Sequence, residues 1–173
     1  FELLMASYAM AHLKMDMLLT ETGYKPTDDQ RFRIFLTNSL EEAHPDTGTL
    51  FSSWLSDEAD QANAIKRDAP VMVVIGNPPY AVSSTNKGPW IQNLIADYKK
   101  DLNERKINLD DDYIKFTRFG QHFIDKNGSG VLAYISANSF IDGVTHRQMR
   151  KHLLESFDKI YIIDLHGNAK KKE

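Results

Sequence analysis

The chain has 173 residues, of which 42% are hydrophobic and 26% charged; it carries a formal net charge of −3 and contains no cysteine. These values are typical of a globular chain of about one domain. The absence of cysteine excludes a disulfide scaffold, a thiolate zinc site and a cysteine nucleophile, and the short apolar runs exclude a membrane span. The near-neutral charge argues against wholesale binding of a polyanion but permits a local basic patch.

The first part of the chain predicts helices and one short strand. Apolar residues recur at helical spacing over about the first twenty positions, which indicates an amphipathic helix that Gly23 would end. Residues 32–36 alternate as a short strand does. An acidic, proline-punctuated stretch over 41–70 predicts a loop and then a helix near 57–67, with Ser56 as its N-cap.

The rest of the chain alternates short β segments with longer helices. The unbroken apolar run 71–75 favours a strand buried on both faces. Pro89 suits the first residue of a helix, and Asn127-Gly128 suits the end of the next. The predicted elements are strands at 71–75, 131–135 and 160–163, and helices from 89, over 113–124 and over 144–157. This order predicts an α/β fold with right-handed crossovers and a mainly parallel sheet.

In a parallel sheet, ligands bind outside the carboxyl ends of the strands, so the loop after Ile75 is the first candidate site. That loop reads Asn77-Pro78-Pro79-Tyr80. A rigid turn is one interpretation, because each proline fixes its own φ and restricts the preceding residue.

The same four residues also suit methyl transfer to a planar amino group. The Asn77 side-chain oxygen and the Pro78 carbonyl could accept the two amino hydrogens, and Pro78 and Pro79 would preorganise these acceptors. Tyr80 could stack on the base, which a duplex would have to flip out.

Asn-Pro-Pro-Tyr after a β strand resembles the catalytic motif of the S-adenosylmethionine-dependent amino-methyltransferases, which include DNA adenine-N6 and protein-glutamine enzymes. Further stretches resemble the methyltransferase domain of large restriction–modification enzymes, among them single-chain helicase–methylases and type I/IIG-like systems. They are Asn86-Lys87-Gly88-Pro89-Trp90-Ile91, Asp111-Asp112-Tyr113-Ile114-Lys115-Phe116, Met149-Arg150, and Asp164-Leu165-His166-Gly167-Asn168. Two other stretches resemble motifs of the wider methyltransferase family: Phe35-Leu36-Thr37-Asn38-Ser39-Leu40 resembles its third-strand motif, and Gly130-Val131-Leu132-Ala133-Tyr134-Ile135 with Asn138-Ser139-Phe140 resembles its strand-five motif.

The resemblance implies a catalytic role for Asn77, Pro78, Pro79 and Tyr80, and binding of the cofactor S-adenosyl-L-methionine by Glu2, Asn38 and Asn77. It implies a partial Rossmann-like methyltransferase fold in which residues 1–173 run from the end of strand two to just after strand six. The first strand and its glycine-rich loop would be absent. We therefore expect an inactive fragment with either a split or rearranged sheet or self-association that repairs it.

The expected partners are double-stranded DNA with a flipped adenine and the rest of a parent polypeptide, which would carry target-recognition modules and could carry helicase or nuclease modules. Lys87, Arg147 and Arg150 are candidate phosphate contacts, although a charged helix face is more often simply solvated. The histidines show no metal-ligand spacing, and no metal site is expected. We expect a cytoplasmic enzyme without membrane partners. A protein or RNA amino-methyltransferase and a non-catalytic scaffold of the same fold remain alternatives.

Overall fold

The computed structural model describes residues 1–25, 31–42, 53–81, 83–104, 107 and 109–166. The chain divides into two compact units, Phe1–Ala69 and Pro70–Glu173, which are described in turn. No described helix is both long and apolar enough to cross a lipid bilayer.

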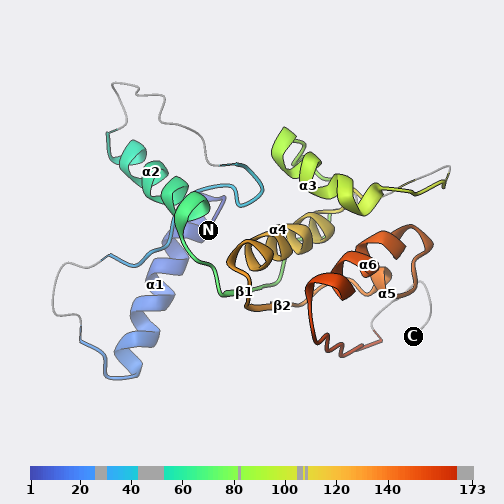
Figure 1. Ribbon diagram of the computed structural model, residues 1–173. Coiled ribbons are helices and arrows are strands. Elements are labelled where there is room, and N and C mark those ends of the chain that lie inside the picture. The colour runs from blue at the N-terminus through green and yellow to red at the C-terminus, as the bar shows by residue number, and fades with distance from the viewer. Residues whose placement is uncertain (26–30, 43–52, 82, 105–106, 108, 167–173) are drawn as a thin grey trace. The chain divides into compact units, whose positions relative to one another are not determined.

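The described residues of the first unit form the helices α1 (Met5–Glu21) and α2 (Ser53–Asp68) (Figure 1). An isolated parallel bridge joins Glu2 and Leu36. The predicted first helix is confirmed, and Gly23 follows its end with a positive φ of 79°. No residue of α1 is buried, so its apolar residues are not packed into a core. The predicted strand at 32–36 is reduced to the single bridge at Leu36.

The prediction for the start of α2 is wrong. The helix begins at Ser53, so Ser56 lies inside it and is not its N-cap. Serine costs little in a helix, and its capping preference therefore does not by itself fix where a helix starts.

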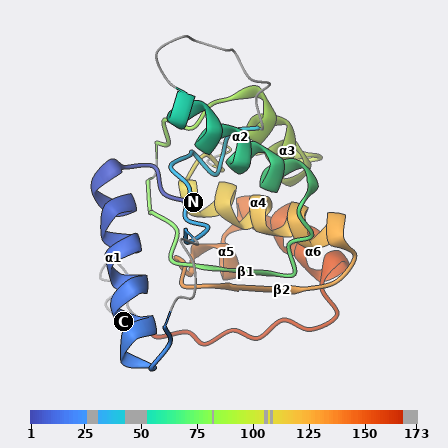
Figure 2. The same ribbon diagram turned by 90° about the vertical axis from the view of Figure 1, so that its left-hand side faces the viewer.

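The second unit is built on two parallel strands, β1 (Val73–Gly76) and β2 (Val131–Tyr134), which pair in the register Val73 to Val131 through Gly76 to Tyr134. The ladder continues at its carboxyl end, where the Ile135 amide donates to the Gly76 carbonyl at 3.1 Å. The helices are α3 (Pro89–Lys99), α4 (Asp112–Asn127), α5 (Ser139–Asp142), the 3₁₀ turn η1 (Val144–His146) and α6 (Arg147–Ser156). Figure 2 shows α4 running along the two strands.

Several predictions for this unit are confirmed, including the parallel pairing. Pro89 opens α3, and Gly128 ends α4 in the left-handed conformation with φ of 81°. Among the described residues, β1 pairs with β2 in this unit, and the first unit has the isolated bridge between Glu2 and Leu36.

Two predictions about the strands are wrong. The strand over 71–75 is not buried on both faces, because α4 packs against one face and leaves Val73 and Ile75 59% and 79% exposed. Residues 160–163 do not form a strand; they are extended after α6 (Figure 2), and Tyr161 and Ile163 are more than four-fifths exposed. β-prone residues form a ladder only where a neighbouring strand accepts their backbone hydrogen bonds.

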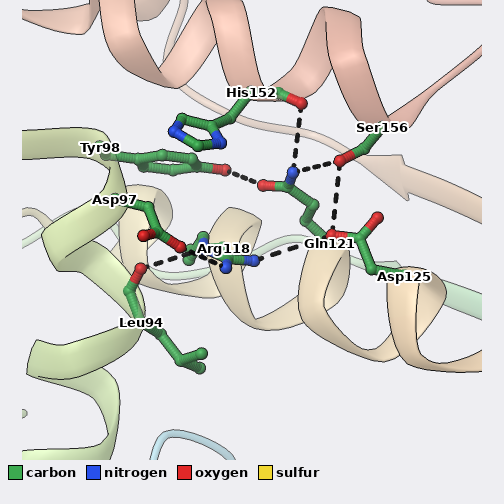
Figure 3. Close-up of polar contacts among 8 residues, drawn as sticks. All are labelled: Leu94, Asp97, Tyr98, Arg118, Gln121, Asp125, His152 and Ser156. Atoms are coloured by element: carbon green, nitrogen blue, oxygen red, sulfur yellow. Dashed lines mark hydrogen bonds and ion pairs between the residues drawn. The ribbon is translucent and has the colours of Figure 1, made fainter. Parts of the chain in front are cut away.

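The core of this unit lies between α3, α4 and α6. Its buried residues are Ile95, Tyr98, Leu109, Tyr113, Ile114, Met149 and Leu153. Figure 3 shows the polar network that crosses this core: the Tyr98 hydroxyl donates to Gln121 at 2.7 Å, and the Gln121 amide donates to the His152 carbonyl at 3.2 Å and to the Ser156 hydroxyl at 2.5 Å. Burial raises the pKa of Tyr98, so its hydroxyl stays protonated as a donor. The network fixes α4 against α3 and α6, and α4 packs against both strands of the sheet.

Candidate active site

The loop Asn77-Pro78-Pro79-Tyr80 leaves the carboxyl end of β1, where the sequence places the chemistry. Pro78 is buried, whereas Asn77, Pro79 and Tyr80 are exposed. The Tyr80 hydroxyl donates to the Asn77 side-chain oxygen at 3.2 Å and lies 3.4 Å from the carbonyl of Ile135, directly after β2. The loop therefore contacts the carboxyl ends of both strands and presents an amide and an aromatic ring at the surface.

The Tyr80 ring lies beside the buried ring of Tyr113, with 6.5 Å between the centroids. The Tyr113 hydroxyl shares hydrogen bonds with the Ser139 hydroxyl at 2.8 Å and with the imidazole of His146 at 3.2 Å. Burial raises the pKa of Tyr113, and burial together with the nearby Arg150 lowers the pKa of His146. Both side chains are therefore neutral at pH 7. The Tyr80 ring thus lies beside a neutral group of side chains formed by Tyr113, Ser139 and His146.

The segment after the motif is held by the beginning of α4. The Ala81 amide donates to the Asp111 side chain at 3.0 Å, and the Asn86 amide group donates to the Asp112 side chain at 3.0 Å. The Lys115 ammonium is fully buried and donates to the Asn86 carbonyl at 2.6 Å. These contacts fix the loop on both sides of residue 82.

Glu2 and Asn38 are the two predicted cofactor residues of the first unit. Glu2 pairs through its backbone with the segment that directly precedes Asn38. The Glu2 amide donates to the Phe35 carbonyl at 2.9 Å, and the Thr37 amide donates to the Glu2 carbonyl at 2.8 Å. The Asn38 side chain accepts from the Leu40 amide at 3.0 Å and donates to Glu41 at 3.1 Å. Glu2 thus has a fixed backbone and a half-buried side chain, and Asn38 makes local turn contacts.

Sequence reasoning missed two charged residues of α2 that hold this segment. Glu58 is 2% exposed and accepts from the Leu36 amide at 3.0 Å. Lys66 donates to the Thr37 hydroxyl at 2.9 Å and to the Asn38 carbonyl at 2.8 Å, and burial lowers its pKa. Both lie four residues from the buried Ala62, so the three residues share one face of α2. This spacing could have identified Glu58 and Lys66 as part of a buried face. Charged residues on a helix face usually indicate that the face is solvated, however.

The structure gives internal partners to two of the three candidate phosphate contacts. Arg147 pairs with Glu104, and Arg150 donates to the carbonyls of Phe140 and Gly143, both at 2.8 Å. Lys87 is exposed on the loop before α3. A phosphate contact by any of the three stays a prediction, and for both arginines it would compete with these contacts.

The part of the chain that the structure describes contains no candidate metal site. Within those ranges, no three His, Asp or Glu side chains gather closely enough to hold an ion. His166 lies 3.9 Å from Asp164, and its backbone amide donates to the same carboxylate at 3.0 Å, which is a turn contact.

Comparison with known proteins places this site in a family context. Residues 7–170 match the model of the Eco57I restriction-modification methylase family. The fold is similar to that of a nuclease-deletion mutant of the Type ISP restriction-modification enzyme LlaGI in complex with a DNA substrate mimic. The TM-score is 0.72 at 22% identity, over 90% of this chain and 13% of that one. It is also similar to DrdV in a DNA complex, with a TM-score of 0.70 at 29% identity over 94% of this chain and 16% of that one.

The chain therefore spans 13% and 16% of the lengths of these two relatives. No curated protein sequence gives a significant match.

Proposed function

Because the chain belongs to the Eco57I restriction-modification methylase family, we propose that it is part of a DNA methyltransferase that transfers a methyl group from S-adenosyl-L-methionine to adenine N6. The observation that carries the proposal is the Asn77–Tyr80 loop at the carboxyl end of a parallel strand, in a chain of a methylase family. The two solved relatives, both in complexes with DNA or a DNA mimic, support DNA as the acceptor.

The chemistry assigned to the loop follows from the weak nucleophilicity of a conjugated amino group. The Asn77 side-chain oxygen and the Pro78 carbonyl would accept its two hydrogens and stabilise the positive charge that develops on nitrogen. Such acceptors lower a barrier only if they are fixed in advance, and the buried Pro78 and the rigid Pro79 provide that fixation.

Tyr80 would bind the base. Tyr80 is 55% exposed and can stack on a planar base, and its ring lies beside the ring of Tyr113. Stacking contributes about 1–3 kcal/mol per base. An adenine in a duplex would have to be flipped out to reach this ring.

Cofactor binding is assigned to Glu2, with Asn38 and Asn77 as further contacts. S-adenosyl-L-methionine supplies an activated methyl group on a sulfonium, which needs no metal. The half-buried Glu2 carboxylate, on a backbone fixed by its pairing with residues 35–37, has the acceptor oxygens that two ribose hydroxyls require. Asn38 fits less well, because its side chain would have to release the Leu40 amide.

We also propose the kind of domain to which the chain belongs. The described structure is a mixed α/β fold with a small parallel sheet and flanking helices, and we propose that it belongs to a larger Rossmann-like methyltransferase domain. The rest of a longer polypeptide would then supply the remaining cofactor contacts and the recognition of the DNA sequence.

The experiment offers the full-length polypeptide that carries this chain labelled S-adenosylmethionine with DNA, RNA and protein acceptors in parallel. We expect label in DNA, its loss in Asn77→Ala, and wild-type transfer in Asn93→Ala, a matched change on the exposed face of α3. Transfer to protein or RNA alone would overturn the DNA assignment. Undiminished transfer by Asn77→Ala would overturn the role of the loop.

A further inference from the structure

The loop that carries the candidate catalytic residues is anchored at one point immediately after the motif. The Ala81 amide donates to the Asp111 side-chain oxygen Oδ1 at 3.0 Å, and the Ala81 carbonyl accepts from the Asp112 amide at 3.4 Å. Ala81 therefore pairs through both of its backbone groups with the residues that begin α4. Tyr80 and the two prolines lie directly between this anchor and β1.

Asp111 performs two tasks with the same oxygen. Oδ1 also accepts from the Tyr113 amide at 3.4 Å, as an N-cap does, so the residue that starts α4 is the residue that holds Ala81. Tyr113, whose ring lies beside that of Tyr80, is two positions further on in the same helix. One carboxylate therefore sets both the backbone after Tyr80 and the start of the helix that supports its ring.

A second anchor repeats this arrangement further along the loop. Asp112 accepts from the Asn86 amide group at 3.0 Å, and the fully buried Lys115 donates to the Asn86 carbonyl at 2.6 Å. Lys115 also lies 3.5 Å from Asp110. Burial alone would raise the pKa of Asp110, but Lys99 and Lys115 outweigh it and lower that pKa, so the partner of Lys115 is ionised at neutral pH.

We propose that Asp111 is a positioning residue for methyl transfer: it fixes Ala81 and thereby the orientation of Asn77 and Tyr80, beyond its role as a helix cap. The proposal rests on the proposed function of the loop. Its physical basis is that acceptors of a developing charge are effective only when held in place, and that small misplacements at a reacting centre cost rate steeply.

Three substitutions at this position separate positioning from capping. Asp111→Ala removes both hydrogen bonds. Asp111→Ser restores a good N-cap, but its hydroxyl is one bond closer to the backbone and does not span the distance to Ala81. Asp111→Asn keeps Oδ1 and should restore both contacts.

In the full-length polypeptide with DNA and labelled S-adenosylmethionine, we expect Asp111→Ala and Asp111→Ser to lower kcat roughly tenfold to a hundredfold, with much smaller changes in KM. Asp111→Asn should act like the wild type. Thermal melting should show Asp111→Ser less destabilised than Asp111→Ala, because serine keeps the N-cap and loses only the contact with Ala81. Asp97→Ala is the matched control: this carboxylate of α3 pairs with Arg118 and not with the loop, and kcat should be unchanged.

Hydrogen exchange at the Ala81 amide gives a readout that does not depend on activity. We expect faster exchange in Asp111→Ala and Asp111→Ser than in Asp111→Asn and the wild type. Full activity of Asp111→Ser, or unchanged exchange in it, would overturn the proposal. If the wild type transfers no methyl group to DNA, the proposed function fails, and the exchange pattern still decides whether Asp111 holds the loop.

Discussion

Gly130 lies just before β2, and replacing it with alanine tests the packing that places the candidate site. An added Cβ would lie 2.4 Å from the Met72 carbonyl oxygen and 2.6 Å from the end of the Ile124 side chain. The Met72 carbonyl cannot retreat freely, because it accepts the Val131 amide at 2.8 Å and so begins the parallel ladder. The substitution therefore pushes the backbone before β1 and the Ile124 side chain of α4 away from the start of β2.

The expected magnitude combines two opposing effects. Overpacking a well-packed site costs about 1–3 kcal/mol, and replacing glycine restricts the unfolded chain, which returns about 0.4–1 kcal/mol. We expect the free energy of unfolding to fall by about 1–2 kcal/mol and Tm to fall by about 2–8 °C. Thermal melting followed by far-ultraviolet circular dichroism measures the change.

Gly88→Ala is the matched control, because no atom lies within 4 Å of its Cβ and its φ of −58° suits alanine. Gly88 is the N-cap of α3, a position that disfavours alanine, and the restriction of the unfolded chain offsets this cost, so stability should change by no more than about 0.5 kcal/mol. The reasoning is refuted if Gly130→Ala melts together with the wild type, or if Gly88→Ala costs as much as Gly130→Ala.

Three further predictions concern residues around the loop. Lys115→Met leaves the Asn86 carbonyl without its buried donor and should lower the free energy of unfolding by about 1–3 kcal/mol in urea titrations, and an unchanged midpoint would contradict it. Burial lowers the pKa of His146 from 6.5, so the folded state favours the neutral ring and should lose stability as pH falls below 6.5; His146→Gln should flatten that decline, and parallel pH profiles would refute this. Tyr80→Ala should raise KM for DNA roughly tenfold through lost stacking, whereas Tyr80→Phe, which keeps the ring, should change it little; equal effects would exclude stacking.

The sequence predicts elements best where local chemistry decides them. Pro89 begins α3 because its ring suits the first helical position, and Gly128 ends α4 because it adopts a positive φ without strain. Asp111 is the N-cap of α4, a position at which aspartate is among the preferred residues. The position of Asn77–Tyr80 after a strand of a parallel pair is likewise confirmed.

Tertiary partners decide the features that the sequence could not provide. Val73 and Ile75 are apolar, as expected in a strand buried on both faces, yet α4 covers only one face of β1. Residues 160–163 are β-prone but do not pair with a neighbouring strand in the described structure. The roles of Glu58 and Lys66 depend on contacts with a segment more than twenty residues away, and their spacing on the helix does not reveal that segment. The partners of Arg147 and Arg150 are hidden from the sequence in the same way.

The most direct test of the central claim is the identity of the methylated base. DNA incubated with S-adenosylmethionine and the full-length polypeptide is digested to nucleosides and measured by mass spectrometry. The proposal predicts N6-methyladenine from the wild-type protein and none from Asn77→Ala. Methylation found only on cytosine, or N6-methyladenine undiminished in the variant, would contradict it.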